Sequence, residues 1–296
     1  MSTPSARAGA RPLTRRELLA RLLAAGSAAA IAPATLRAMV ADLPDAAAAR
    51  PLGLQLYTVR TLMQRDVDAT LKAVAAIGYR EVETAGYFDR SPEDWRALLD
   101  SHGLVAPSAH VALPEHDVAW RATVQAARTV GAGWVVIPWV DPAAHRTRDA
   151  WRRLADRLSA LGRLAAADGL RIAYHNHDFE FAPLPGGPTG FDVLAESIDA
   201  SVVDLELDLF WMQRAARDPW QILRTHRNVR MFHCKDIGPG PGYAMVDVGD
   251  GTLDWPRIAK AARTHGVRHL FVEHDNPADP LASVRRSHAA LARATR

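Results

Sequence analysis

Residues 174–181, YHNHDFEF, end a hydrophobic run with two imidazoles, an amide and two carboxylates. Three later hydrophobic runs end in a similar way, at 205–208 (LELD), 231–236 (MFHCKD) and 271–275 (FVEHD). Imidazoles and carboxylates bind divalent cations and also transfer protons. If these runs are strands of one barrel, their polar ends meet at a single rim. The pattern therefore predicts an enzyme with a metal site at that rim.

One polar residue from each of these four runs is a candidate ligand of a single divalent cation. The predicted ligands are Glu180, Asp208, His233 and Glu273. A lone Asp or His after a strand is more often a helix cap, but four successive strands with such residues favour a metal. Three carboxylates and one imidazole form an oxygen-rich set, which favours Mn²⁺, with Mg²⁺, Co²⁺ or Zn²⁺ as alternatives.

Strand-like and helix-like segments alternate from Pro51 to the end of the chain. Strands are expected at 52–57, 80–84, 105–110, 134–138, 171–176, 202–208, 229–233 and 269–273. Helices are expected at 67–77, 92–102, 119–130, 150–167, 191–198, 219–225, 255–264 and 281–294. Eight strand–helix units in about 245 residues predict a (β/α)₈ TIM barrel over 51–296. A doubly wound sheet is less consistent, because no GxGxxG motif follows the first strand.

In such a barrel the chemistry lies at the carboxyl ends of the strands. The first four strands place these residues there: Gln55, Tyr57, Glu83, His110 and Trp139. Alternation along 202–208 points residues 204, 206 and 208 to one side, with residue 208 nearest the mouth. A carboxylate as deep as residue 206 needs a partner, and we expect it to be paired inside the barrel.

Residues 1–50 differ from the rest of the chain. An Arg pair at 15–16 precedes an Ala- and Leu-rich stretch at 22–34 that has no acidic residue. This order predicts a cleavable twin-arginine-type signal peptide and tether over 1–50, with export to the periplasm. The apolar run is shorter than the ~20 residues of a membrane span, so no stable membrane anchor is expected.

The net charge excludes one class of partner. Residues 1–50 carry seven Arg and three acidic residues, so the overall charge of +3 leaves about −1 on residues 51–296. A nearly neutral barrel has no basic face for nucleic acid, which argues against a DNA-cleaving phosphodiesterase with this fold.

The single cysteine, Cys234, excludes an intrachain disulfide. A homo-oligomer is compatible with the sequence.

From Leu52 onward the chain resembles the xylose-isomerase-like TIM-barrel superfamily, the group of sugar phosphate isomerases and epimerases. The resemblance lies in 53–57 (GLQLY), 108–110 (SAH), 174–177 (YHNH), 207–211 (LDLFW), 233–236 (HCKD), 249–255 (GDGTLDW) and 272–275 (VEHD). It implies a metal bound by Glu, Asp, His and Glu that holds two neighbouring sugar oxygens. Residues 208, 233 and 273 match three of these ligands. The ligand from the fifth strand could be Glu180, His175 or His177, of which Glu180 keeps the site anionic.

The predicted function is a sugar isomerase or epimerase that acts through an enediolate on an unphosphorylated sugar or keto-sugar. If that intermediate expels a β-substituent, the enzyme is instead a lyase or dehydratase acting on a keto-sugar or an inosose-like substrate. A non-catalytic sugar-binding barrel is the remaining alternative. The predicted catalytic residues are Glu180, Glu273, His177 and Lys235. The predicted substrate-binding residues are Gln55, Tyr57, His110, Trp139 and His175.

Overall fold

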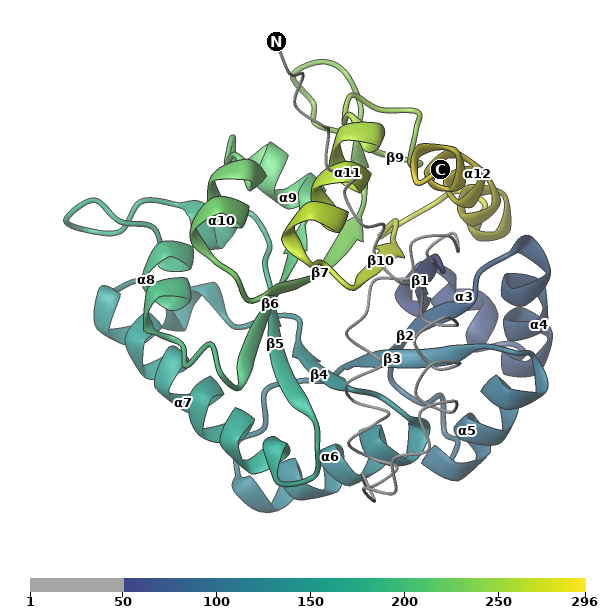
Figure 1. The fold of residues 1–296 in the computed structure, drawn as a ribbon, viewed down its shortest axis with the longest axis horizontal. Helices are drawn as coiled ribbons and strands as arrows, with labels where there is room; N and C mark the ends of the chain where they lie inside the picture. Colours follow the sequence, from purple (N-terminus) through teal and green to yellow (C-terminus); the bar gives the residue numbers. More distant parts are fainter. Residues whose placement is uncertain (1–50) are drawn as a thin grey trace, which may run out of the picture. The chain divides into compact units, whose positions relative to one another are not determined.

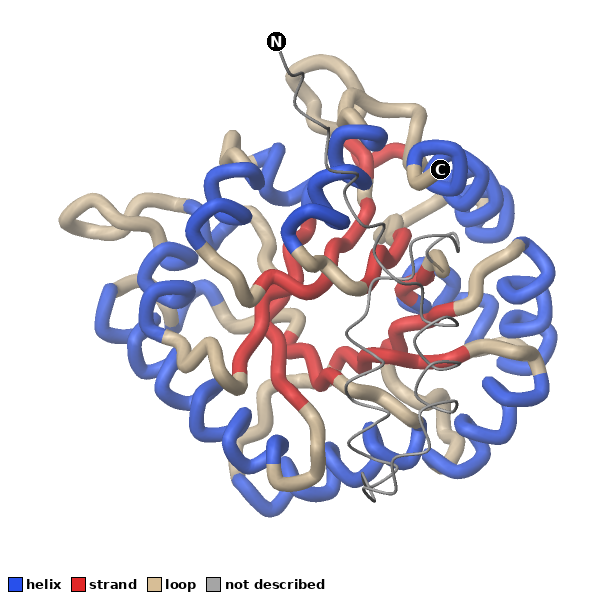
Figure 2. Tube along the Cα trace, viewed as in Figure 1, coloured by secondary structure: helices blue, strands red, loops and turns tan. Residues whose placement is uncertain are grey.

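The computed structural model describes residues 51–296. The signal peptide and tether expected over 1–50 lie outside the described residues and stay a prediction. Residues Pro51–Arg296 form one compact unit, with the strands at its centre and the helices around them (Figures 1 and 2).

Within the described residues, eight parallel strands close into a barrel in the order β1-β10-β7-β6-β5-β4-β3-β2. The strands are β1 (Gly53–Gln55), β2 (Glu81–Ala85), β3 (Val105–His110), β4 (Trp134–Ile137), β5 (Arg171–His175), β6 (Val203–Asp208), β7 (Val229–Cys234) and β10 (His269–Val272). A short antiparallel pair, β8 (Asp236–Ile237) and β9 (Met245–Val246), follows β7. The predicted (β/α)₈ barrel is confirmed.

The eight expected helices are found within one or two residues of their predicted bounds, and the short helices α3 and α9 were not predicted. They are α3 (Arg60–Met63), α4 (Val67–Ile77), α5 (Pro92–Ser101), α6 (Asp117–Val130), α7 (Arg148–Ala166), α8 (Gly190–Ser197), α9 (Leu209–Arg214), α10 (Pro219–Thr225), α11 (Trp255–His265) and α12 (Pro280–Ala294). Three short 3₁₀ helices are η1 (Leu56–Val59), η2 (Pro142–Ala144) and η3 (Phe179–Phe181). Side-chain caps start many of these helices; for example, Asp66 Oδ1 accepts a hydrogen bond from Ala69 N at 2.9 Å.

The first strand is shorter than expected. It ends at Gln55, whose side-chain oxygen accepts a hydrogen bond from Tyr57 N at 3.0 Å and so starts η1. The chain therefore turns out of the barrel before Tyr57, which is 43% exposed. Tyr57 lies on the rim, while Gln55 remains buried among the strands.

Two apolar regions hold the barrel together. The larger one packs the outer faces of the strands against the helices. The smaller one lies inside the barrel and consists of Trp134, Val136, Ala173, Met231 and Phe271. A Cβ on Gly53 would lie 2.3 Å from the Phe271 ring, so glycine is needed there to admit it. This smaller region, here called the plug, fills one end of the barrel interior. The polar side chains therefore lie toward the carboxyl ends of the strands.

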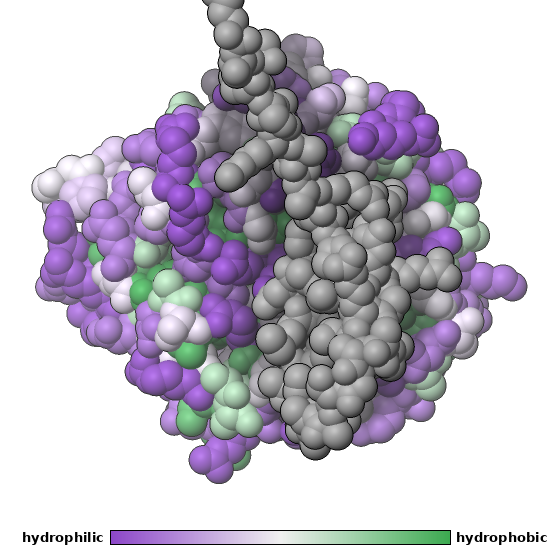
Figure 3. All heavy atoms as spheres, in the orientation of Figure 1, coloured by the Kyte–Doolittle hydropathy of each residue, from purple (hydrophilic) through white to green (hydrophobic). Residues whose placement is uncertain are grey.

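One face of the described residues is seen in Figure 3. The coloured residues in Figure 3 are mostly hydrophilic, with hydrophobic residues in small separate groups. Among the described residues, none of the helices has the length and apolar character that crossing a membrane requires.

Candidate active site at the barrel mouth

Strand β6 supplies three carboxylates at three depths, as the alternation predicted. Asp204, Glu206 and Asp208 are all fully buried. Asp204, the deepest, accepts hydrogen bonds from Trp134 Nε1 at 2.7 Å and Arg171 Nη2 at 2.9 Å. It therefore has a structural role on the plug. Glu206 lies in a middle layer and Asp208 in the layer at the mouth, and each belongs to a cluster of titratable side chains.

The upper cluster consists of Asp208, His233 and Glu273. Each offers one ligand atom, and these atoms lie within 4.8 Å of one another. His233 Nδ1 is 2.7 Å from Glu273 Oε2. Asp208 Oδ1 caps α9 by accepting a hydrogen bond from Trp211 N at 3.1 Å, which leaves the buried Oδ2 without a well-directed hydrogen bond. Two carboxylates and one imidazole whose ligand atoms converge in this way fit a divalent cation.

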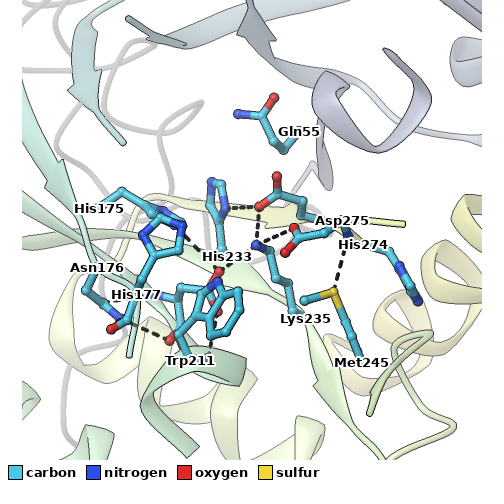
Figure 4. Close-up of polar contacts among 12 residues, drawn as sticks. Gln55, His175, Asn176, His177, Trp211, His233, Lys235, Met245, His274 and Asp275 are labelled. Atoms are coloured by element: carbon cyan, nitrogen blue, oxygen red, sulfur yellow. Dashed lines mark hydrogen bonds and ion pairs between the residues drawn. The ribbon is translucent and has the colours of Figure 1, made fainter. Parts of the chain in front are cut away.

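Lys235 directly faces this upper cluster (Figure 4). Its buried ammonium lies 3.0 Å from Asp208 Oδ2, 2.9 Å from Glu273 Oε2 and 2.8 Å from Asp275 Oδ1. Burial alone would lower the Lys235 pKa, but the three carboxylates outweigh it and hold that pKa well above its usual value. Burial raises the pKa of Asp208 to about 6, against the opposing influence of Lys235.

A second cluster, here called the inner cluster, lies one layer deeper. It consists of His110, His175, Glu206 and His233, whose ligand atoms also lie within 4.8 Å of one another. Glu206 Oε2 is 3.0 Å from His110 Nε2, 3.2 Å from His175 Nδ1 and 3.2 Å from His233 Nε2. His233 therefore belongs to both clusters through different ring nitrogens.

Glu83 on β2 borders the inner cluster. Its Oε2 lies 2.9 Å from His110 Nε2 and 2.7 Å from His233 Nε2, and it accepts a hydrogen bond from Gln55 Nε2 at 2.7 Å. Burial would lower the pKa of His110, but Glu83 and Glu206 raise it to about 9. Gln55, predicted to bind substrate, thus contacts Glu83 and not the cavity.

Sequence reasoning did not assign Glu83 and Glu206 to the site. The available signal was position, because Glu206 shares the inward face of β6 with Asp208 and Glu83 was noted at the end of the second strand. Strand register then decides the contacts. His175 pairs with Glu206 and Asp208 pairs with His233 across adjacent strands.

The structure does not bring Glu180 to the other predicted ligands. The residue lies in η3, fully buried, and it belongs to neither cluster. Its carboxylate accepts hydrogen bonds from Tyr174 Oη and His177 N, each at 2.9 Å. Burial raises its pKa to about 8. Its assignment as the fourth ligand and as a catalytic acid or base therefore stays a prediction, without contact to Asp208, His233 or Glu273.

A cavity of about 560 Å³ opens over both clusters. The predicted catalytic residues Lys235, Glu273 and His177 line it, together with four predicted substrate-binding residues, Tyr57, His110, Trp139 and His175. Trp139 is 53% exposed and stands with Tyr57 at the rim. The volume is in the range of small-molecule sites.

His177 presents a neutral imidazole to this cavity. Burial and the nearby Lys235 lower the pKa of His177 to about 3, and its buried Nδ1 has no hydrogen-bond partner among the described residues. The imidazole also lies close to Trp211, with ring centroids 5.4 Å apart. An uncharged ring with a free nitrogen can accept a proton from a bound ligand.

Comparison with known proteins agrees with this geometry. The family model described as xylose isomerase-like TIM barrel matches residues 71–294. The chain belongs to this family.

Curated proteins that match part of this chain include inosose dehydratases. The inosose dehydratase of Clostridium botulinum (strain Alaska E43 / Type E3) is 30% identical over 145 residues, which are 43% of this chain and 48% of that protein. The inosose dehydratase of Bacillus anthracis (strain CDC 684 / NRRL 3495) is 32% identical over 92 residues, 31% of this chain and 30% of that protein. The chain thus spans about half the length, or less, of these curated relatives.

Solved structures show the same barrel. A sugar phosphate isomerase/epimerase from Parabacteroides distasonis ATCC 8503 superposes with a TM-score of 0.75 at 21% identity, covering 86% of this chain and 98% of that one. The IOLI protein, solved with a zinc atom, gives a TM-score of 0.67 at 16% identity, covering 83% of this chain and 98% of that one. At these identities the similarity establishes the fold alone.

Proposed function

We propose that this xylose isomerase-like barrel is a divalent-metal-dependent sugar isomerase or epimerase, acting on an unphosphorylated sugar or keto-sugar. The observation that carries the proposal is the upper cluster of Asp208, His233 and Glu273, of which Glu273 lines a cavity with an aromatic rim. Family membership supports an enzyme of this kind. The twin-arginine pattern of 1–50 supports the further proposal that it acts in the periplasm.

The donor set fits one divalent cation, with Mn²⁺ as the proposed metal. Asp208, His233 and Glu273 would hold it, and the cation would compete with the Lys235 ammonium for Oδ2 of Asp208. When bound, such a cation supplies Lewis-acid polarisation of a substrate oxygen.

The other polar residues of the cavity would handle the proton. His177, whose neutral ring lines the cavity, would take the proton from the carbon beside the carbonyl. Lys235 would donate a hydrogen bond to the oxygen that becomes negative, because its ammonium keeps its proton. The aromatic faces of Tyr57 and Trp139 would orient the apolar side of a sugar ring at the rim.

The charge of the cavity favours a substrate without phosphate. Among the residues that line it, Lys235 is the single Lys or Arg, and three carboxylates already contact its ammonium. Glu273 and Asp275 add negative charge to the same wall. The lining residues therefore offer a phosphate group no unpaired Lys or Arg side chain.

A lyase or dehydratase is the second candidate, and the inosose dehydratase matches favour it. Both reactions begin with the same proton abstraction beside a carbonyl. They differ in whether the enediolate is reprotonated at carbon or expels a β-hydroxyl or β-alkoxy group as water or alcohol. For that second outcome Lys235 or His177 would protonate the leaving oxygen.

The test is NMR of candidate substrates in deuterated water with enzyme and Mn²⁺. Aldoses, ketoses, 3-keto glycosides and inososes are the candidates. Deuterium entering at one carbon of the unchanged or isomerised sugar supports the isomerase. Loss of a β-substituent with appearance of an unsaturated ketone supports the lyase.

Matched variants connect either outcome to the site. Asp208→Asn and His177→Gln should each abolish exchange, while Asp141→Asn and His116→Gln replace exposed residues of the same types and should keep it. No exchange and no elimination with any of the four substrate classes would refute the proposal.

A further inference from the structure

Three residues of the inner cluster, His110, His175 and Glu206, take no part in the proposed function. Glu206, His175 and His233 are buried, and the His110 side chain is 12% exposed. These residues come from β3, β5, β6 and β7, so the closed barrel brings them together from four strands. Figure 4 shows the rings of His175 and His233 near each other behind Lys235, with centroids 4.4 Å apart.

The spacing of the ligand atoms suits a common cation. Three imidazole nitrogens lie 3.0, 3.2 and 3.2 Å from Glu206 Oε2. With metal–ligand bonds of about 2.0–2.1 Å, neighbouring ligand atoms lie about 2.9–3.4 Å apart, depending on coordination geometry. The three separations from Glu206 Oε2 fall in that interval. The other oxygen, Glu206 Oε1, is buried and has no hydrogen-bond partner among the described residues.

The inner layer also holds two buried carboxylates that share imidazole partners. Glu83 and Glu206 are fully buried carboxylates, and the ion-pair partners found for them among the described residues are imidazoles. His110 Nε2 is shared between both carboxylates, at 2.9 and 3.0 Å, and a single N–H proton cannot point at both. A divalent cation would balance both carboxylates and accept every nitrogen lone pair at once.

We propose that His110, His175, Glu206 and His233 bind a divalent cation of their own, of the zinc type, beneath the upper cluster. Three imidazoles and one carboxylate are a nitrogen-rich set, which suits Zn²⁺ or Co²⁺ better than Mg²⁺. His233 would face this inner ion with Nε2 and the upper ion with Nδ1, so with both ions bound it would be an imidazolate that has released its ring proton to solvent. Glu83, held by Gln55 and Ser108, would supply a further oxygen beside His110 and His233.

Metal content of the purified full chain tests this proposal. The protein is stripped with a chelator, dialysed against Co²⁺ or Zn²⁺, and analysed by elemental mass spectrometry and by the visible absorption of bound Co²⁺. The wild type is expected to bind two equivalents. His110→Ala should lose one of them together with the Co²⁺ absorption of the nitrogen-rich site. Asp208→Asn should lose the other and keep that absorption.

Controls separate loss of the ion from loss of the fold. His116→Ala removes an exposed imidazole and should leave the metal content unchanged. His175→Gln is a second variant of the inner cluster, and circular dichroism reports whether each variant folds. Metal content and Co²⁺ absorption that survive both His110→Ala and His175→Gln would overturn the proposal. So would a single equivalent in the wild type that Asp208→Asn removes.

The inner site and the proposed function can fail separately. A single equivalent that Asp208→Asn leaves in place and His110→Ala removes would support the inner site. The same result would contradict metal binding by the upper cluster, on which the proposed function rests.

Discussion

Replacement of Lys235 by Met should destabilise the protein, because two carboxylates of the upper cluster lose a cationic partner. The ammonium contacts Asp208 and Glu273, which are 0% and 6% exposed, so both charges lose their main cationic partner inside the protein. Removing one partner of a buried pair costs about 3–5 kcal/mol. The third contact, to the partly exposed Asp275, adds little because solvent screens it. In the presence of a chelator we therefore expect Lys235→Met to lose about 3–5 kcal/mol of unfolding free energy.

A divalent cation should reverse part of this loss, because it can replace the missing positive charge. Binding at a concentration 100 times the dissociation constant stabilises a protein by about 2.7 kcal/mol. Without the competing ammonium, Mn²⁺ should bind Lys235→Met more tightly than wild type, so Mn²⁺ should narrow the stability gap. Turnover should stay low in the variant even with Mn²⁺, since the hydrogen-bond donor to the substrate oxygen is gone.

Urea denaturation with and without Mn²⁺ measures the difference in unfolding free energy between Lys235→Met and wild type. Lys260→Met, which replaces an exposed lysine of α11, is the matched control and should change the unfolding free energy by less than about 0.5 kcal/mol. If the unfolding free energies of Lys235→Met and wild type, both measured with chelator, differ by less than about 1 kcal/mol, the buried ion pairs of Lys235 are contradicted. A gap that Mn²⁺ leaves unchanged would contradict metal binding by the upper cluster.

Three further predictions concern residues other than Lys235 and the upper cluster. The Glu180 carboxyl has its pKa raised from an ordinary 4.5 to about 8, so it stays protonated when folded and ionises when unfolded. Stability should therefore fall as pH rises from about 5 to 8, and Glu180→Gln should remove this fall in pH-dependent urea titrations. Trp139→Ala should raise KM about 3–10-fold with little change in kcat, as steady-state kinetics would show, because its ring stands at the rim. Replacing Arg15 and Arg16 by Lys should retain the protein in the cytoplasm, as measured by cell fractionation.

The sequence by itself determined the barrel and the rim. Regular alternation of hydrophobic runs and helical segments, with glycines such as Gly266 in a left-handed conformation at helix ends, is local information. Alternation along 203–208 also ordered Asp204, Glu206 and Asp208 by depth, since successive side chains of a strand point to opposite faces. Polar strand ends then placed Asp208, His233 and Glu273 at one rim, because parallel strands of a barrel end on the same side.

Only the tertiary structure decided which of these groups touch. Barrel closure puts Glu83 of β2 against His233 of β7, which are far apart in sequence. The turn of η3 buries Glu180 against Tyr174, although its sequence position after β5 suggested a ligand. The length of the Lys235 side chain lets its ammonium reach Asp208 and Glu273 on neighbouring strands. These contacts depend on strand register and on side-chain reach across the barrel, and a one-dimensional pattern carries neither.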